Sequence, residues 1–249
     1  FEINSEVLDN IGKKFSIPPK PQMLSVLQNH LSAEEPDIGG VADTISQDIG
    51  IAASVLKLVN TPAFGLSRTV SDIKQSVMFI GLRGISSLVT GLLLKQAFDQ
   101  SKCCISLERF WDSAVNVANV SMMVGQRVKH KFPLEDLYTA ALFVDCGIPA
   151  MAIRFQDYLE ILQQANDDLM NSPAMLEEKR YSTNHAVVGY YIATSWNLPP
   201  MICQNVLYHH DRDFLNTLDD SDAQILYAVL KASENIVSNH KEYRDTSDW

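Results

Sequence analysis

The stretch that decides the fold is residues 137–152, LYTAALFVDCGIPAMA, in which Asp145 is the one charged side chain. Its apolar residues would cover a helix on nearly every side, which is typical of a helix at the centre of a fold. We therefore predict a central helix over Leu137–Ala152. A carboxylate in such a helix is costly to bury unless it is paired, hydrogen-bonded or bound to a metal. Asp145 is thus either a metal ligand or buried polar anchor, or a side chain that caps a neighbouring helix, and we favour the second interpretation.

Helical patterns extend from this stretch in both directions. On the amino-terminal side, Asp37, Asp48 and either Ser71 or Asp72 stand where helix caps are expected, and Gly81 should break a helix. Polar residues 99–102 then indicate a boundary between two helical lobes. On the other side, helices are predicted over about 158–165, 174–179, 183–196, 199–210 and 223–237. Since no segment alternates like a strand, we predict an all-α fold.

The composition of the chain disfavours several classes of function. The chain has 249 residues, of which 46% are hydrophobic and 20% charged, as in an ordinary globular protein. Its formal net charge of -10 disfavours binding to nucleic acid or to anionic membranes, because both need a basic face. The 4 cysteines form neither a disulfide framework nor a paired zinc motif. We expect reduced thiols, no membrane span and a cytoplasmic location.

Histidines provide the other candidate chemistry. His185 follows Thr183-Asn184 at a helix start, and His209-His210 closes a later helix. Together with Asp145 they could form a metal site, although hydrogen bonding at helix ends is the interpretation that we favour for them. Adjacent residues of a helix point about 100° apart, so we expect at most one of His209 and His210 to face any one site.

Motifs in the first half of the chain carry a family resemblance. They are IPPKP at 17–21, DI at 37–38, ISQD at 45–48, LKLVNTPAFG at 56–65 and SVMFIGLR at 76–83. Together they strongly resemble the HDOD domain, a bacterial regulatory module related to HD-domain phosphohydrolases. The resemblance implies an HDOD domain over 15–215, with an amino-terminal helical lobe over about 15–102 and an HD-like lobe over about 103–215. Residues 216–249 would then form a carboxy-terminal helix and tail.

The HD-like lobe departs from catalytic HD proteins at their metal-ligand positions. By the resemblance, Ser113 and Val144 stand where those proteins have histidines, and Ser233 stands where the last aspartate is expected. The retained positions are Asp145, His185 and the pair His209 and His210. A two-metal hydrolase site would therefore lack ligands. We expect no catalytic residues and no cofactor; a residual metal, if one binds, would be held by Asp145, His185 and His209.

The resemblance thus implies a non-catalytic module of bacterial signal transduction. We expect it to bind a signalling protein partner, with a nucleotide-like ligand as the other candidate. A groove between the lobes would be lined by Asn60, Phe64 and Arg83, although each of these also fits a turn that joins helices. The acidic segment 211–222 is a second candidate contact surface. The alternative function is that of a residual metal-dependent phosphohydrolase of the HD superfamily.

Overall fold

The computed structural model describes residues 15–128, 132–167, 172–211 and 213–242, and every regular element in these ranges is helical. This confirms the all-α fold. The elements are, in chain order, α2 (Gln22–Ser32), α3 (Ile38–Ser46), α4 (Ile49–Val59), η1 (Pro62–Phe64), α5 (Ile73–Gln96), η2 (Gln100–Lys102), α6 (Leu107–Gly125), α7 (Leu134–Phe143), α8 (Gly147–Arg154), α9 (Tyr158–Asp167), α10 (Pro173–Tyr181), α11 (His185–Ser195), α12 (Pro200–Tyr208), α13 (Phe214–Thr217) and α14 (Ser221–Glu242).

Aspartate caps begin three of the amino-terminal helices, as predicted. The carboxylate of Asp37 accepts a hydrogen bond from the Gly39 amide at 2.8 Å, and that of Asp48 accepts one from Ile51 at 2.9 Å. Asp72, rather than Ser71, caps α5 through the Gln75 amide at 2.8 Å. Each bond satisfies an amide that has no partner within the first turn of its helix.

The predicted break at Gly81 is also confirmed. This residue has φ 83° and ψ 163°, so α5 consists of two helical segments joined at a kink. A left-handed φ of this kind favours glycine, because a Cβ would strain the backbone. After the kink, the second half of α5 packs on α7, where Ser87 and Gly91 lie against Thr139.

The single central helix predicted over Leu137–Ala152 is wrong, because α7 ends at Phe143 and α8 begins at Gly147. The backbone of Gly147 lies so close to α11 that a Cβ there would be 1.9 Å from the carbonyl oxygen of His185. Pro149, which has no amide to donate, falls in the first turn of α8, where proline is tolerated. Asp145 consequently lies in the turn between two helices, and 40% of its side chain is exposed.

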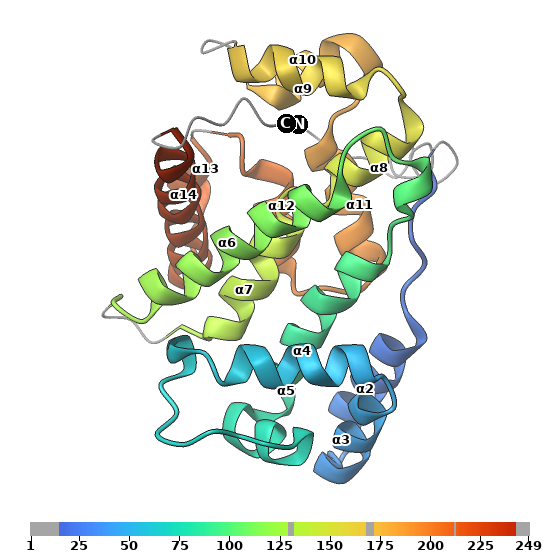
Figure 1. Ribbon diagram of the computed structural model, residues 1–249. Coiled ribbons are helices and arrows are strands. Elements are labelled where there is room, and N and C mark those ends of the chain that lie inside the picture. The colour runs from blue at the N-terminus through green and yellow to red at the C-terminus, as the bar shows by residue number, and fades with distance from the viewer. Residues whose placement is uncertain (1–14, 129–131, 168–171, 212, 243–249) are drawn as a thin grey trace.

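The helices are arranged around the α6–α7 pair (Figure 1), with α5 packed on α7 and α14 packed on α6. Helices α2, α3 and α4 gather with the first half of α5 at one end of the molecule, and α9 and α10 lie at the opposite end. Between them, α11 packs against both α8 and α12. Because α5 packs against both α3–α4 and α7, it connects the two groups of helices; the lobe boundary near residue 102 stays a prediction.

Two stretches are long and apolar enough to cross a bilayer by length and composition alone, namely Ile73–Gln96 and Leu134–Arg154. Within the fold, 61% and 78% of their most apolar windows are buried. Core helices have this same character, because they must be apolar on every side that touches a neighbour.

Candidate functional site

Asp145, His185, His209 and His210 converge on one point. Each offers one ligand atom, and the four atoms lie within 4.8 Å of one another. Nε2 of His185 is 3.5 Å from Oδ1 of Asp145, 3.3 Å from Nε2 of His209 and 2.9 Å from Nε2 of His210. Nε2 of His209 is 3.2 Å from the same Asp145 oxygen. The structure thus brings together the four retained positions that the sequence analysis singled out.

The crossing of α8 and α11 sets the first half of this cluster. Gly147 at the start of α8 and Gly189 in α11 face each other, and a Cβ on Gly189 would be 3.2 Å from the Gly147 amide nitrogen. Because neither residue has a side chain, the two backbones approach closely. Asn184 caps α11 by accepting a hydrogen bond from the Val187 amide at 3.0 Å. His185, the first residue of α11, is thereby held beside Asp145.

The end of α12 supplies the other half. We expected at most one of His209 and His210 to face the site, and this expectation is wrong because both take part. His209 follows the end of α12 at Tyr208 and keeps helical φ and ψ angles of -61° and -18°, and the rings of both histidines nevertheless reach the same point. Their ring centroids lie 4.0 Å apart.

Hydrogen-bond partners assign the tautomers of the two buried histidines. Nδ1 of His209 lies 2.8 Å from the carbonyl oxygen of Val206, which can only accept, so this nitrogen carries the proton. Nδ1 of His185 likewise lies 2.7 Å from Oε2 of Glu177. In the neutral form, both rings therefore direct an Nε2 lone pair at the same point as the Asp145 carboxylate. Such an arrangement of acceptors requires a positive charge between them, either a proton or a metal ion.

Glu177 on α10 is a site residue that sequence reasoning missed. It is fully buried, and its carboxylate also accepts hydrogen bonds from the His185 amide at 2.7 Å and from the Tyr158 hydroxyl. Nothing in the run Glu177-Glu178-Lys179-Arg180 distinguishes a buried acid from exposed ones. Its burial depends on Tyr158 of α9 and His185 of α11, which the chain brings together only on folding.

Charges within the cluster shift its pKa values in opposite directions. Burial raises the pKa of the Asp145 carboxyl, but hydrogen bonds from His185 and His209, which require a proton on Nε2 of each ring, outweigh burial and hold that pKa well below its usual range. Burial lowers the pKa of His185, while the charge of Glu177 and a hydrogen bond to Asp145 raise it, for a result of about 10. Burial, then the charges of His209 and His185, put the pKa of His210 far below its usual value. A proton therefore occupies His185 when no other cation is present.

The donor set fits a metal ion of the zinc class. Zinc–nitrogen bonds of about 2.0–2.1 Å place neighbouring ligands of a tetrahedron about 3.3 Å apart. Four of the six separations between the ligand atoms, from 2.9 to 3.5 Å, surround that value, and all six are within 4.8 Å. Three imidazoles and one carboxylate favour zinc and similar transition metals over magnesium or calcium, which prefer oxygen ligands. Asp145, 40% exposed, forms the side of the cluster that is open to solvent.

The other predicted positions of the HD-like site add no acidic or imidazole donor. Val144 is buried and has an apolar side chain. The Ser233 hydroxyl donates to the Val229 carbonyl at 2.7 Å, one turn earlier in α14. Ser113 lies half-buried on α6.

The three residues predicted for a groove have different surroundings. Asn60 joins two backbone segments, because its amide nitrogen donates to Leu56 and Val70 and its oxygen accepts from the Val70 amide, each at 2.8 Å. Phe64 packs partly buried against the core. Arg83 is exposed and lowers the pKa of Asp136 on α7 by its charge, against burial, which raises it.

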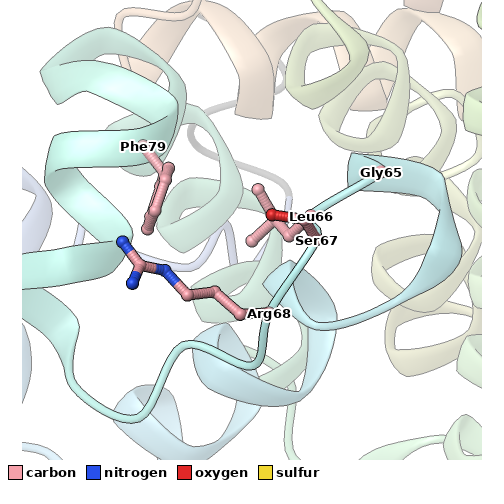
Figure 2. A pocket seen from close by; sticks show the side chains of 5 residues that line it. All are labelled: Gly65, Leu66, Ser67, Arg68 and Phe79. Atoms are coloured by element: carbon pink, nitrogen blue, oxygen red, sulfur yellow. The ribbon is translucent and has the colours of Figure 1, made fainter.

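A shallow hollow of about 520 Å³ lies beside these residues, and its lining differs from the predicted one. Figure 2 shows Arg68 extending toward the ring of Phe79 on α5, opposite the segment of Gly65, Leu66 and Ser67. Phe79 is 50% exposed. None of the residues that line this hollow belongs to the histidine cluster.

Sequence comparison gives a family match over most of the chain. The sequence model of the HDOD domain matches residues 17–212. An uncharacterized protein of Treponema pallidum (strain Nichols) is 24% identical over 199 residues, which is 78% of this chain and 38% of that protein. The chain therefore spans well under half the length of this curated relative.

Solved structures show the same fold. An HDOD domain protein of unknown function from Geobacter sulfurreducens matches with a TM-score of 0.69 and 23% identity, covering 94% of this chain and 76% of the other. A protein from Shewanella amazonensis SB2B described as a candidate phosphohydrolase matches with a TM-score of 0.73 and 17% identity. The match covers 96% of this chain and 82% of the other. A protein from Marinobacter aquaeolei VT8 described as a candidate signal transduction protein matches with a TM-score of 0.65 and 14% identity. The match covers 96% of this chain and 52% of the other.

Proposed function

Because this chain belongs to the HDOD domain family, we propose that it is a non-catalytic module of bacterial signal transduction in which the histidine cluster holds one divalent transition-metal ion. Asp145, His185, His209 and His210 would hold the ion. From the sequence alone we predict no cofactor, with only Asp145, His185 and His209 as ligands of a residual metal. The geometry of the cluster leads us to propose the metal with a fourth ligand, His210.

The observation that carries this proposal is the number of protein donors at one point. Four ligand atoms lie within 4.8 Å of one another. Catalytic zinc sites usually have three protein ligands and leave a position for water, whereas structural sites have four. An ion held by three histidines and an aspartate would have its tetrahedral positions filled by the protein. It would join the α7–α8 turn, α11 and the end of α12, and its role in the chain would be to fix their arrangement.

A non-catalytic role is supported by the positions that would complete a second metal site, because they offer no metal ligands. Val144 offers no ligand atom, and the Ser233 hydroxyl is used within its own helix. Two-metal phosphoryl transfer requires a second ion about 3.5–4 Å from the first, and this needs further carboxylate or imidazole ligands.

The alternative is a residual metal-dependent phosphohydrolase. One observation favours it: the 40% exposure of the Asp145 side chain gives the cluster access to solvent. A substrate could reach the ion if Asp145 moved away or if the ion took more than four ligands.

A signalling protein is the partner that we propose, with a cytoplasmic location for the complex. The segment that follows the cluster carries exposed carboxylates at Asp211, Asp213, Asp219 and Asp220. Because acidic groups attract basic faces, a partner with a basic surface is favoured there. A nucleotide-like ligand would instead suit a site with a cation and an aromatic ring, which the hollow at Arg68 and Phe79 offers.

The test is an assay of phosphate-ester hydrolysis by the full chain loaded with zinc, manganese or cobalt. Bis(p-nitrophenyl) phosphate, p-nitrophenyl phosphate and a cyclic dinucleotide serve as substrates, and Asp145→Ala is the matched variant. We expect metal binding without turnover above that of Asp145→Ala. Turnover that Asp145→Ala abolishes would contradict the non-catalytic role and establish the alternative.

A further inference from the structure

We propose that Glu177 is a positioning residue of the cation site, which it controls through His185 without touching the ion. The inference rests on the proposed function, because it concerns the same cluster. It adds a residue from α10, a helix that supplies none of the four ligands.

Glu177 holds His185 at two places. Its Oε2 atom accepts from the backbone amide of His185 at 2.7 Å and lies 2.7 Å from Nδ1 of the same ring. Its Oε1 atom lies 2.8 Å from that nitrogen and accepts from the Tyr158 hydroxyl. The carboxylate thus fixes both the start of α11 and the orientation of the ring.

Because both residues are buried, the contacts with Glu177 determine which ring nitrogen of His185 carries the proton. Glu177 is 0% exposed and His185 is 1% exposed, so water does not compete for either partner. A carboxylate that accepts from Nδ1 keeps the proton there and leaves Nε2 free to bind a cation. Partners of this kind also make the imidazole a stronger ligand, and their loss typically weakens metal binding by about 10–100-fold.

Charge gives Glu177 a second effect. The cluster itself contains one carboxylate, Asp145, beside three imidazoles. With Glu177 behind His185, two negative charges face a divalent ion, which they neutralise. Removal of the Glu177 charge would leave a buried ion with one unit of uncompensated positive charge, and such a charge is costly.

Glu177→Gln is the variant that tests the inference, because it removes the charge and keeps the shape. The Gln side chain is neutral, so it holds the Nδ1 proton of His185 less strongly than a carboxylate does. Where its NH2 group faces Nδ1, it also moves the ring proton to Nε2, the ligand atom. Glu178→Gln is the matched control: its carboxylate lies next in sequence and accepts from the Asn184 side chain at 3.1 Å, away from the His185 ring.

The experiment is a titration of the metal-free full chain with cobalt(II), followed by visible absorption. For wild type and Glu178→Gln we expect saturation at one equivalent with the same absorption band. For Glu177→Gln we expect affinity about 10–100-fold weaker and a band of altered position or intensity, which reports a changed ligand geometry. Circular dichroism verifies that each variant is folded.

The outcomes separate this inference from the proposed function. If wild type shows no saturable cobalt band, the proposed cation site fails. If wild type binds and Glu177→Gln binds with the same affinity and band, only the role of Glu177 is overturned. A second measurement needs no variant: nitrogen NMR of the zinc-loaded wild type should show a protonated Nδ1 and a metal-bound Nε2 in His185. An unprotonated Nδ1 would overturn the inference even if Glu177→Gln does not fold.

Discussion

Nε2 of His185 lies 3.3 Å from Nε2 of His209, and in both rings Nδ1 is committed to an acceptor elsewhere. Two lone pairs at this distance repel unless a positive charge lies between them. The Asp145 carboxylate, 3.2 Å from the His209 nitrogen, adds a third acceptor. This relationship is the physical basis for a cation at the cluster.

Removal of any one cluster histidine should weaken zinc binding. For His185→Ala, His209→Ala and His210→Ala we expect losses greater than the roughly 10–100-fold typical of an outer partner, since each removes a ligand atom. Competition with a chromogenic zinc chelator measures the affinities. His30→Ala, on α2, is the control and should bind as wild type does. If His210→Ala binds zinc as tightly as the control, His210 is not a ligand.

Gly147→Ala should disturb the fold and the site together. A Cβ would lie 1.9 Å from the His185 carbonyl oxygen and 2.8 Å from the Gly189 amide nitrogen, so α8 must move away from α11. We expect a loss of about 1–3 kcal/mol in the free energy of unfolding, as for other overpacked cores, and weaker zinc binding.

Urea unfolding and the zinc titration test Gly147→Ala. The control is Gly50→Ala at an exposed position of α4, where the nearest atom to a Cβ is the capping oxygen of Asp48 at 3.3 Å. Because alanine favours helix, this control should be neutral or slightly stabilised. Wild-type stability in Gly147→Ala would show that α8 and α11 are not in close contact.

Asn60→Ala tests whether this residue is structural. It would leave the buried amide and carbonyl of Val70 without their side-chain partner, which costs about 1–3 kcal/mol for a group that stays unsatisfied. Thermal unfolding measures the change, and exposed Gln96→Ala is the control. Unchanged stability would return Asn60 to the list of candidate binding residues.

Asp136→Asn should alter the pH dependence of stability. Burial raises the pKa of Asp136 above its ordinary 3.8, although the Ser87 hydroxyl and the charge of Arg83 lower it. A carboxyl with a raised folded-state pKa contributes most stability below 3.8, and that contribution is lost as pH rises through the folded-state pKa.

The variant should therefore be more stable than wild type at neutral pH, with a gain that shrinks as the pH falls toward 3.8. Urea unfolding across this range measures the gain, and the exposed Asp43→Asn serves as control. A gain that is constant with pH would mean that the ionisation of Asp136 is not its source.

The sequence predicted features that depend on neighbouring residues. The caps at Asp37 and Asp48 follow from a side chain and amides two or three positions away, so local pattern suffices. The break at Gly81 was predictable for the same reason. The histidines, too, were candidates from residue type alone, because imidazoles are metal ligands, although their places at helix ends favoured a structural role.

Contacts between distant segments explain what the sequence did not reveal. The break between α7 and α8 coincides with a close approach of the backbones of Gly147 and His185, and this contact between residues 38 positions apart is not visible in the sequence. His209 and His210 meet His185, which lies 24 and 25 positions earlier in the chain. Glu177 is buried because Tyr158 and His185 surround it, and its sequence neighbours give no sign of this.

The central claim is that the cluster binds a single transition-metal ion. Isothermal titration calorimetry of chelator-stripped full chain with zinc tests it most directly, with the His185→Ala/His209→Ala double variant beside it. We expect saturation at one equivalent for wild type and no saturable binding for the double variant. No saturable binding by wild type, or equal binding by both proteins, would contradict it.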